Sequence, residues 1–168
     1  MEVIGIGYLA IICQNIDETV NFYCNGLGFE KIYQEPNRDD PESTQVLLMN
    51  KNGNGIMLVG PNDPNMKLAE KNIGVGSMQY LALYVKNADL DEAFYSLSNA
   101  GIQISEEIQR GYERMIFLED PNGTLITLIS WPGIDNLSSN EYIKILKNVE
   151  EYRNKDKSEF IEKKHFEK

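Results

Sequence analysis

The feature that most constrains this chain is an internal repeat. Residues 8–17, YLAIICQNID, align with residues 80–89, YLALYVKNAD, and five of these ten positions are identical at a constant offset of 72. The pair Phe22-Tyr23 recurs at the same offset as Phe94-Tyr95. A repeat of this period predicts two copies of one supersecondary unit. We therefore expect two modules, residues 4–60 and 78–131, joined by a linker over residues 61–77 that is rich in Gly, Pro and Asn.

Each copy predicts the same order of elements. In the first copy, an apolar strand precedes a short helix that we expect Asp17 to cap and Gly26 and Gly28 to end. The expected elements are a strand over 5–13, a helix over 17–25 and strands over 29–35, 44–49 and 55–59. The second copy predicts a strand over 79–85, a helix over 89–99 and strands over 103–109, 112–118 and 124–130. A βαβββ pattern that occurs twice predicts an α+β fold.

Residues 133–168 are an addition to the repeat and predict a helical extension. Ser138 and Glu141 have the spacing of a capping box, and an apolar stripe follows them. The stripe consists of Ile145, Leu146, Val149 and Tyr152. Because an isolated helix is marginal in water, we expect this one to pack on its own domain or on a partner chain. The charged segment beyond Lys157 is expected to fray.

The composition excludes some classes of function. The chain of 168 residues has a net charge of −10, and residues 1–132, expected to form one domain, contain the whole acidic excess. Such a charge argues against nucleic-acid binding and favours a cationic ligand, although acidity also serves solubility. No apolar run has the length of a membrane span, and no secretion signal is visible. Cys13 and Cys24 form no CxxC pair, so we expect free thiols and a cytoplasmic protein.

Two local motifs accompany the repeat. Residues 17–29, DETVNFYCNGLGF, contain an "FY…LGF" pattern, and residues 117–125, FLEDPNGTL, contain an Asp-Pro-Asn-Gly turn between two strands. With these motifs at this spacing, the sequence resembles the vicinal-oxygen-chelate superfamily of glyoxalases, bleomycin-resistance proteins and extradiol dioxygenases over about residues 4–131. The resemblance implies that the two modules pair into a cupped, open barrel with one active site, and that the protein is a homodimer.

The resemblance also implies a metal site with one ligand near the start of each module and one on its last strand. The corresponding positions carry Tyr8, Tyr80, Met57 and Thr127, none of which is an ordinary ligand for zinc, nickel or ferrous iron. Independently of the alignment, the single histidine is His165, outside both modules, and neither last strand contains Asp or Glu. We therefore expect no metal and no other cofactor.

The same positions predict a site for a small molecule. Strand alternation places Tyr84 on the face of Tyr80, which lines the cup in the family. We expect a site formed by Tyr8, Met57, Tyr80, Tyr84, Arg114 and Thr127. Phenols in such a cup stack on a flat ligand and donate hydrogen bonds to it. The alternatives are aromatic filling of an empty pocket or a ferric-phenolate site for the tyrosines, core packing for Met57, and an ion pair with Glu113 or Glu119 for Arg114.

These expectations favour a metal-independent protein that binds a small molecule and sequesters a cationic or aromatic compound, as in antibiotic resistance. No catalytic residue is predicted. The alternatives are a glyoxalase- or dioxygenase-like metalloenzyme with non-standard ligands and an orphan regulatory domain of the same fold. The fold does not choose among them, because one fold hosts several chemistries.

Overall fold

The computed structural model of the protein describes residues 1, 3, 5–63, 65–70, 72 and 74–167, so the expected first residue of the first module, Ile4, lies outside the described residues. The chain divides into two compact units, one of residues 1–79 and 119–124 and the other of residues 80–118 and 125–168. Each unit contains one four-stranded sheet, in the order β1-β4-β3-β2 or β5-β8-β7-β6. The expected α+β fold with two βαβββ modules is confirmed.

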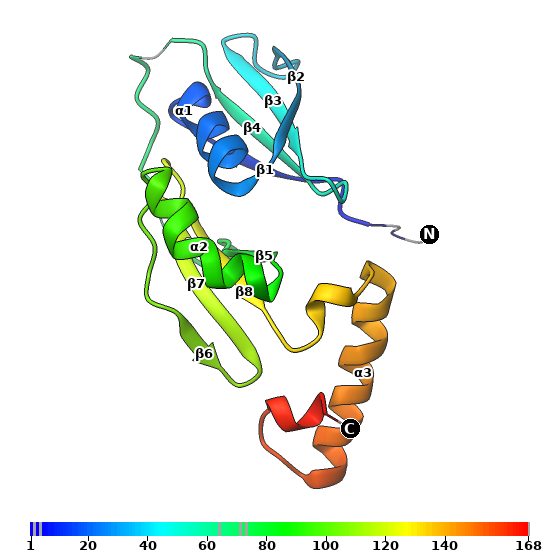
Figure 1. The fold of residues 1–168 in the computed structure, drawn as a ribbon. Coiled ribbons are helices and arrows are strands. Elements are labelled where there is room, and N and C mark those ends of the chain that lie inside the picture. The colour runs from blue at the N-terminus through cyan, green and yellow to red at the C-terminus, as the bar shows by residue number, and fades with distance from the viewer. Residues whose placement is uncertain (2, 4, 64, 71, 73, 168) are drawn as a thin grey trace. The chain divides into compact units, whose positions relative to one another are not determined.

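In the first unit, α1 (Ile16–Asn21) packs on the sheet of β1 (Tyr8–Ile12), β2 (Glu30–Pro36), β3 (Ser43–Met49) and β4 (Gly55–Pro61) (Figure 1). β1 pairs with β4 in parallel, and β3 pairs with both β2 and β4 in antiparallel fashion. Gly60 of β4 faces the helix, because a Cβ atom there would lie 2.7 Å from the Cys13 carbonyl oxygen and 2.9 Å from Ile16. The alternating residues Ile56 and Leu58 share that face and are buried.

The second unit repeats this arrangement. Its strands are β5 (Leu81–Tyr84), β6 (Ile108–Arg110), β7 (Glu113–Glu119) and β8 (Leu125–Ser130), and its helix is α2 (Asn87–Asn99). β5 pairs with β8 in parallel, as β1 does with β4. Leu90, Ala93 and Leu97 are the buried residues of α2, at the spacing of one helix face.

Two local expectations are wrong. The cap of α1 is Asn15, whose side-chain oxygen accepts a hydrogen bond from the Glu18 backbone N–H at 3.1 Å, while Asp17 lies inside the first turn. The strand expected over 103–109 shrinks to β6 and a single bridge between Ile104 and Leu118. Ser105 interrupts it, because its hydroxyl oxygen accepts the Phe117 backbone N–H at 2.9 Å in place of a strand carbonyl.

The extension forms α3 (Ser139–Asp156), which begins after Ser138 and is followed by a short 3-10 turn, Lys163–His165. The Ser138 N–H donates to the Glu141 carboxylate at 2.7 Å, as a capping box requires. The apolar stripe is at least half-buried, with Val149 only 2% exposed. In the residues that the structure describes, no helix has the length and apolar character to cross a membrane.

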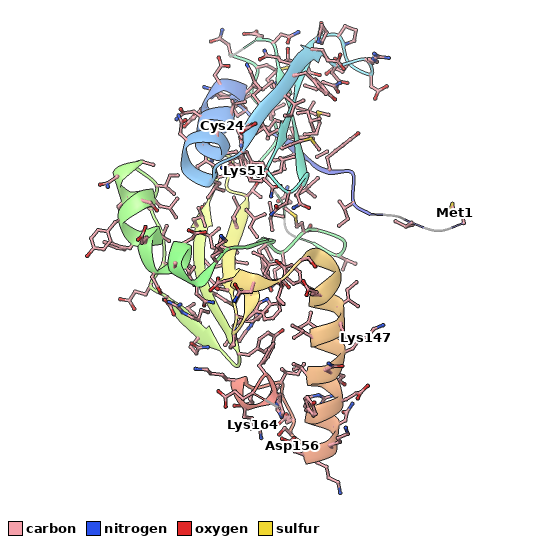
Figure 2. All side chains as sticks on the ribbon, turned by 45° about the vertical axis from the view of Figure 1, so that its right-hand side comes forward. Met1, Cys24, Lys51, Lys147, Asp156 and Lys164 are labelled. Atoms are coloured by element: carbon pink, nitrogen blue, oxygen red, sulfur yellow. The ribbon has the colours of Figure 1, made fainter. Side chains whose placement is uncertain are left out.

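The expected fraying beyond Lys157 is wrong. His165 is fully buried, and its Nδ1 accepts a hydrogen bond from the Glu162 backbone N–H at 2.8 Å. Its Nε2 lies 2.9 Å from the Asp156 carboxylate. Lys164 joins the same carboxylate at 3.1 Å, and Figure 2 shows both charged residues at the end of α3. These contacts fold the last residues back against the helix.

Candidate functional site

Each sheet has a far face, by which we mean the face turned away from its own helix. In the first unit, Ala10 pairs with Met57 across β1 and β4, so Tyr8 and Met57 share the far face, two positions apart. In the second unit, Ala82 pairs with Thr127 in the same way, so that Tyr80 and Thr127 have the same relation. The repeat in sequence is therefore also a repeat in the placement of these four side chains.

The four side chains differ in burial. Tyr8 is 54% exposed, whereas Met57 is buried. Thr127 is fully buried, and its hydroxyl oxygen has no hydrogen-bond partner among the residues that the structure describes. A buried hydroxyl without a partner costs free energy.

A polar group lies on the far face of the second unit, around Glu113. The Glu113 carboxylate pairs with Arg110 at 2.9 Å. Hydrogen bonding to Glu113, and secondarily to Tyr80, raises the pKa of Arg110. Burial raises the pKa of Tyr84, and the negative charge of Glu113 raises it further. The same two causes raise the pKa of Tyr112 to about 12. Glu113 thus has Tyr84, Tyr112 and Arg110 as neighbours, and Arg110 also contacts Tyr80.

An aromatic cluster adjoins this polar group. Trp131, the residue after β8, is 1% exposed and packs in a core with Met115 and Ile129. The rings of Tyr142 from α3 and Phe166 from the last turn lie 5.7 Å and 5.5 Å from the Trp131 ring. A Cβ atom on Gly111, in the turn between β6 and β7, would lie 2.8 Å from the carbonyl oxygen of residue 161. The extension therefore packs on the far face of its own unit.

Arg114 lies on the opposite face of the sheet. Its guanidinium group pairs with Glu107 through two contacts of 2.8 Å and with Asp91 of α2. Hydrogen bonding to these carboxylates raises the pKa of Arg114. The sequence left two possibilities for Arg114, a place in the ligand site or an ion pair. The structure shows an ion pair, but its partners are Glu107 and Asp91 and not the expected Glu113 or Glu119. Arg114 does not join the tyrosines.

Comparison with known proteins assigns the fold to a family. Residues 5–128 match the Glyoxalase/Bleomycin resistance protein/Dioxygenase superfamily. The chain belongs to this superfamily.

One relative in the superfamily is the proposed ring-cleaving dioxygenase MhqA of Bacillus subtilis (strain 168), 27% identical over 128 residues. The match covers 74% of this chain but 39% of that protein, so the chain spans well under half of the relative's length. Among solved structures, a glyoxylase/bleomycin resistance protein/dioxygenase domain from Frankia sp. EAN1pec has a TM-score of 0.68 at 12% identity, covering 79% of this chain and 96% of that one. The fosfomycin resistance protein FosX from Listeria monocytogenes, complexed with Mn(II) and sulfate, has a TM-score of 0.58 at 17% identity, covering 84% and 99%. At these identities the two structures show the fold alone.

The four far-face positions do not fit a divalent metal. The side chains at these positions are two phenols, a thioether and an aliphatic hydroxyl, whereas divalent ions prefer carboxylates and imidazoles. Among the described residues, no group of three or more His, Cys, Asp or Glu side chains has the arrangement of a metal site. No catalytic step through a metal is derived for this chain.

Sequence reasoning missed Glu113, Arg110, Tyr112 and Tyr142. The position of Glu113 could have been predicted, because Glu113 alternates with Met115 and Phe117 along β7 and therefore shares their face. Tyr142 had the weaker signal of lying one turn before Ile145 and Leu146 on the apolar stripe. The sequence does not reveal on which surface that stripe packs. The contact between Tyr142 and Tyr84 therefore cannot be predicted from it.

Proposed function

We propose that this chain is a metal-independent protein that binds a small organic molecule, cationic or aromatic, through the far faces of its sheets. The observation that carries the proposal is that Tyr8 and Met57 in one unit correspond to Tyr80 and Thr127 in the other. The resemblance to the superfamily implies metal ligands at these four positions, and none of the four is an ordinary metal donor. Phenol rings present flat apolar surfaces and hydroxyl groups, which suit an aromatic ligand better than an inorganic ion.

Two further observations support the proposal. The unpartnered hydroxyl of Thr127 is a hydrogen-bonding group that a ligand would satisfy. The net charge of −10 attracts a cation and repels an anion such as a phosphonate. An enzyme with unusual ligands is the rival, because relatives of this fold include a proposed dioxygenase and a protein complexed with Mn(II).

The test is a thermal-shift screen of the untagged protein against nickel, zinc, manganese and ferrous ions and a panel of cationic aromatic antibiotics. A ligand of the native state stabilises it by about 2.7 kcal/mol at a hundred times its dissociation constant. We expect stabilisation by at least one organic cation and none by the metals. A saturable shift with a stoichiometric metal contradicts the proposal and favours the enzyme.

Variants then locate the site. Tyr80→Ala should weaken the binding of whichever compound stabilises the protein. Tyr95→Ala is the matched control, because Tyr95 is 73% exposed on α2, the element that covers the other face of the sheet. Equal affinities for both variants and the parent protein place the ligand elsewhere and overturn the assignment of the site.

Two expectations about the protein's surroundings belong to the same proposal. The cysteines Cys13 and Cys24 are free thiols, and burial raises the pKa of Cys13 to about 11, which makes it an unreactive thiol. Free thiols suit a cytoplasmic protein. We also propose a homodimer, for which light scattering should give twice the chain mass of 19.2 kDa.

A further inference from the structure

The extension provides an aromatic ring at the edge of the far face in the second unit. Tyr84 of β5 and Tyr142 of α3 have ring centres 5.5 Å apart and ring planes inclined by 65°. Trp131 lies beneath them, 6.2 Å from Tyr84 and 5.7 Å from Tyr142. Tyr84 is 52% exposed, Tyr142 is partly buried and Trp131 is 1% exposed, so the two tyrosines form a partly accessible corner above a buried ring.

A carboxylate stands beside this corner. Glu113 alternates with Met115 along β7 and so lies on the same face as Met115, which packs with Ile129, the β8 partner of Tyr84. Its negative charge contributes to the raised pKa of both Tyr84 and Tyr112. Its side chain is 16% exposed, whereas that of its partner Arg110 is 57% exposed. An ion pair with so exposed a partner contributes little to stability, so another cation can share or replace Arg110 at small cost.

We propose that Tyr84, Tyr142 and Glu113 form a binding site for the alkylated ammonium head of an organic cation. The proposal rests on the proposed function, because it names the chemical class and the subsite of the ligand. In this proposal the C-terminal extension takes part in ligand binding, because its Tyr142 forms one wall of the site.

The chemistry of these three side chains selects such a head group. The faces of aromatic rings carry negative potential and attract cations, and quaternary ammonium ions are typical ligands of paired aromatic rings. Their methyl groups also pack against the rings, which a strongly hydrated ammonium does not do. Glu113 supplies one negative charge, which the ligand shares with Arg110 or takes over from it. A divalent metal requires more oxygen ligands than this corner has.

Choline and its uncharged isostere 3,3-dimethylbutan-1-ol are the probes, because they share a shape and differ in charge. Trp131 is the single tryptophan of the chain, so its fluorescence reports on this cluster alone. We expect choline to change the fluorescence saturably, with calorimetry giving the same dissociation constant. The isostere should bind at least about tenfold more weakly, a difference of about 1.4 kcal/mol. Equal binding of both compounds, or no saturable binding of choline by either method, overturns the proposal.

Variants of the full chain test the residues. Tyr142→Leu and Glu113→Gln should each weaken choline binding by about tenfold. Tyr142→Phe keeps the ring and should retain most of the affinity even if Tyr142→Leu unfolds the extension. Tyr95→Leu is the control, because Tyr95 also belongs to an exposed edge-to-face pair, with Phe94 at 5.7 Å. Unchanged affinity in both Tyr142→Leu and Glu113→Gln contradicts the assignment.

The same experiments separate the two proposals. If an antibiotic from the panel binds in a way that depends on Tyr80 but not on Tyr142 or Glu113, the proposed function stands and this subsite is wrong. If no organic cation stabilises the protein or changes the Trp131 fluorescence, both proposals fail.

Discussion

At the scale of single residues, the Tyr23 hydroxyl joins a helix to a turn 97 positions further along the chain. It donates to the Asp120 carboxylate at 3.2 Å, and both side chains are buried. Asp120 also accepts the backbone N–H groups of Asn122 and Thr124, at 2.9 and 2.8 Å. The carboxylate therefore organises the turn and anchors it to the π-helical turn Phe22–Gly26 that follows α1.

Removing the Tyr23 hydroxyl measures how much the hydrogen bond between Tyr23 and Asp120 contributes to stability. Tyr23→Phe should lower the free energy of unfolding by about 2 kcal/mol, because it leaves a buried carboxylate oxygen with a weakened set of donors. Urea titration measures the change. Tyr95→Phe removes an exposed hydroxyl and should alter stability by less than about 0.5 kcal/mol. Equal effects of the two substitutions contradict a special role for the Tyr23–Asp120 bond.

The raised pKa of Tyr112, about 12, predicts a dependence of stability on pH. A phenol in the unfolded chain ionises near pH 10, whereas the folded protein keeps Tyr112 protonated. The contribution of this group is therefore fully present below about pH 10 and is lost as the pH rises from about 10 to about 12. Urea titrations across this window should show a steeper fall for the parent protein than for Tyr112→Phe. Parallel curves for the two proteins contradict the prediction.

At the scale of elements, α3 offers a matched pair of isoleucines. Ile145 packs against the core of Met115, Ile129 and Trp131, whereas Ile143, two residues earlier, is 60% exposed. Ile145→Ala should destabilise the protein by about 2 kcal/mol, and Ile143→Ala by less than about 0.5 kcal/mol. Chemical unfolding followed by Trp131 fluorescence measures both. A loss of stability in Ile143→Ala as large as in Ile145→Ala contradicts the packing of α3 on this face.

The elements also show what the sequence can predict. Strands and helices follow from alternation and from the repeat, because both are local patterns that each copy reinforces. The cap at Asn15 and the interruption at Ser105 depend on which of several small polar side chains takes a backbone hydrogen bond, and nearby residues compete for that role. The repeat predicts the positions of Tyr8, Met57, Tyr80 and Thr127, but the contact of Tyr84 with Tyr142 depends on how distant segments pack.

At the scale of the whole molecule, the net charge of −10 acts on every ligand that approaches. Raising the salt from about 0.01 M to about 1 M shortens the range of electrostatic interactions from about 30 Å to about 3 Å. We expect the affinity for choline to fall severalfold over this range, because the acidic excess raises the local concentration of cations. Calorimetry in both salts measures the change. An affinity that does not change with salt contradicts this prediction and means that only contacts within the site attract choline.

The turn of residues 119–124 belongs to the first unit, although the strands on either side of it belong to the second. A gene that doubled a βαβββ module would at first encode two interchangeable halves. In the present chain, the second repeat contributes two side chains to the first unit: Asp120 accepts the Tyr23 hydroxyl, and Asn122 accepts the Gln14 backbone N–H at 2.9 Å. A fragment that stops at the linker loses these partners and leaves Tyr23 with a buried, unsatisfied hydroxyl. The first unit therefore depends on residues of the second repeat for buried hydrogen bonds, and the two repeats are no longer interchangeable.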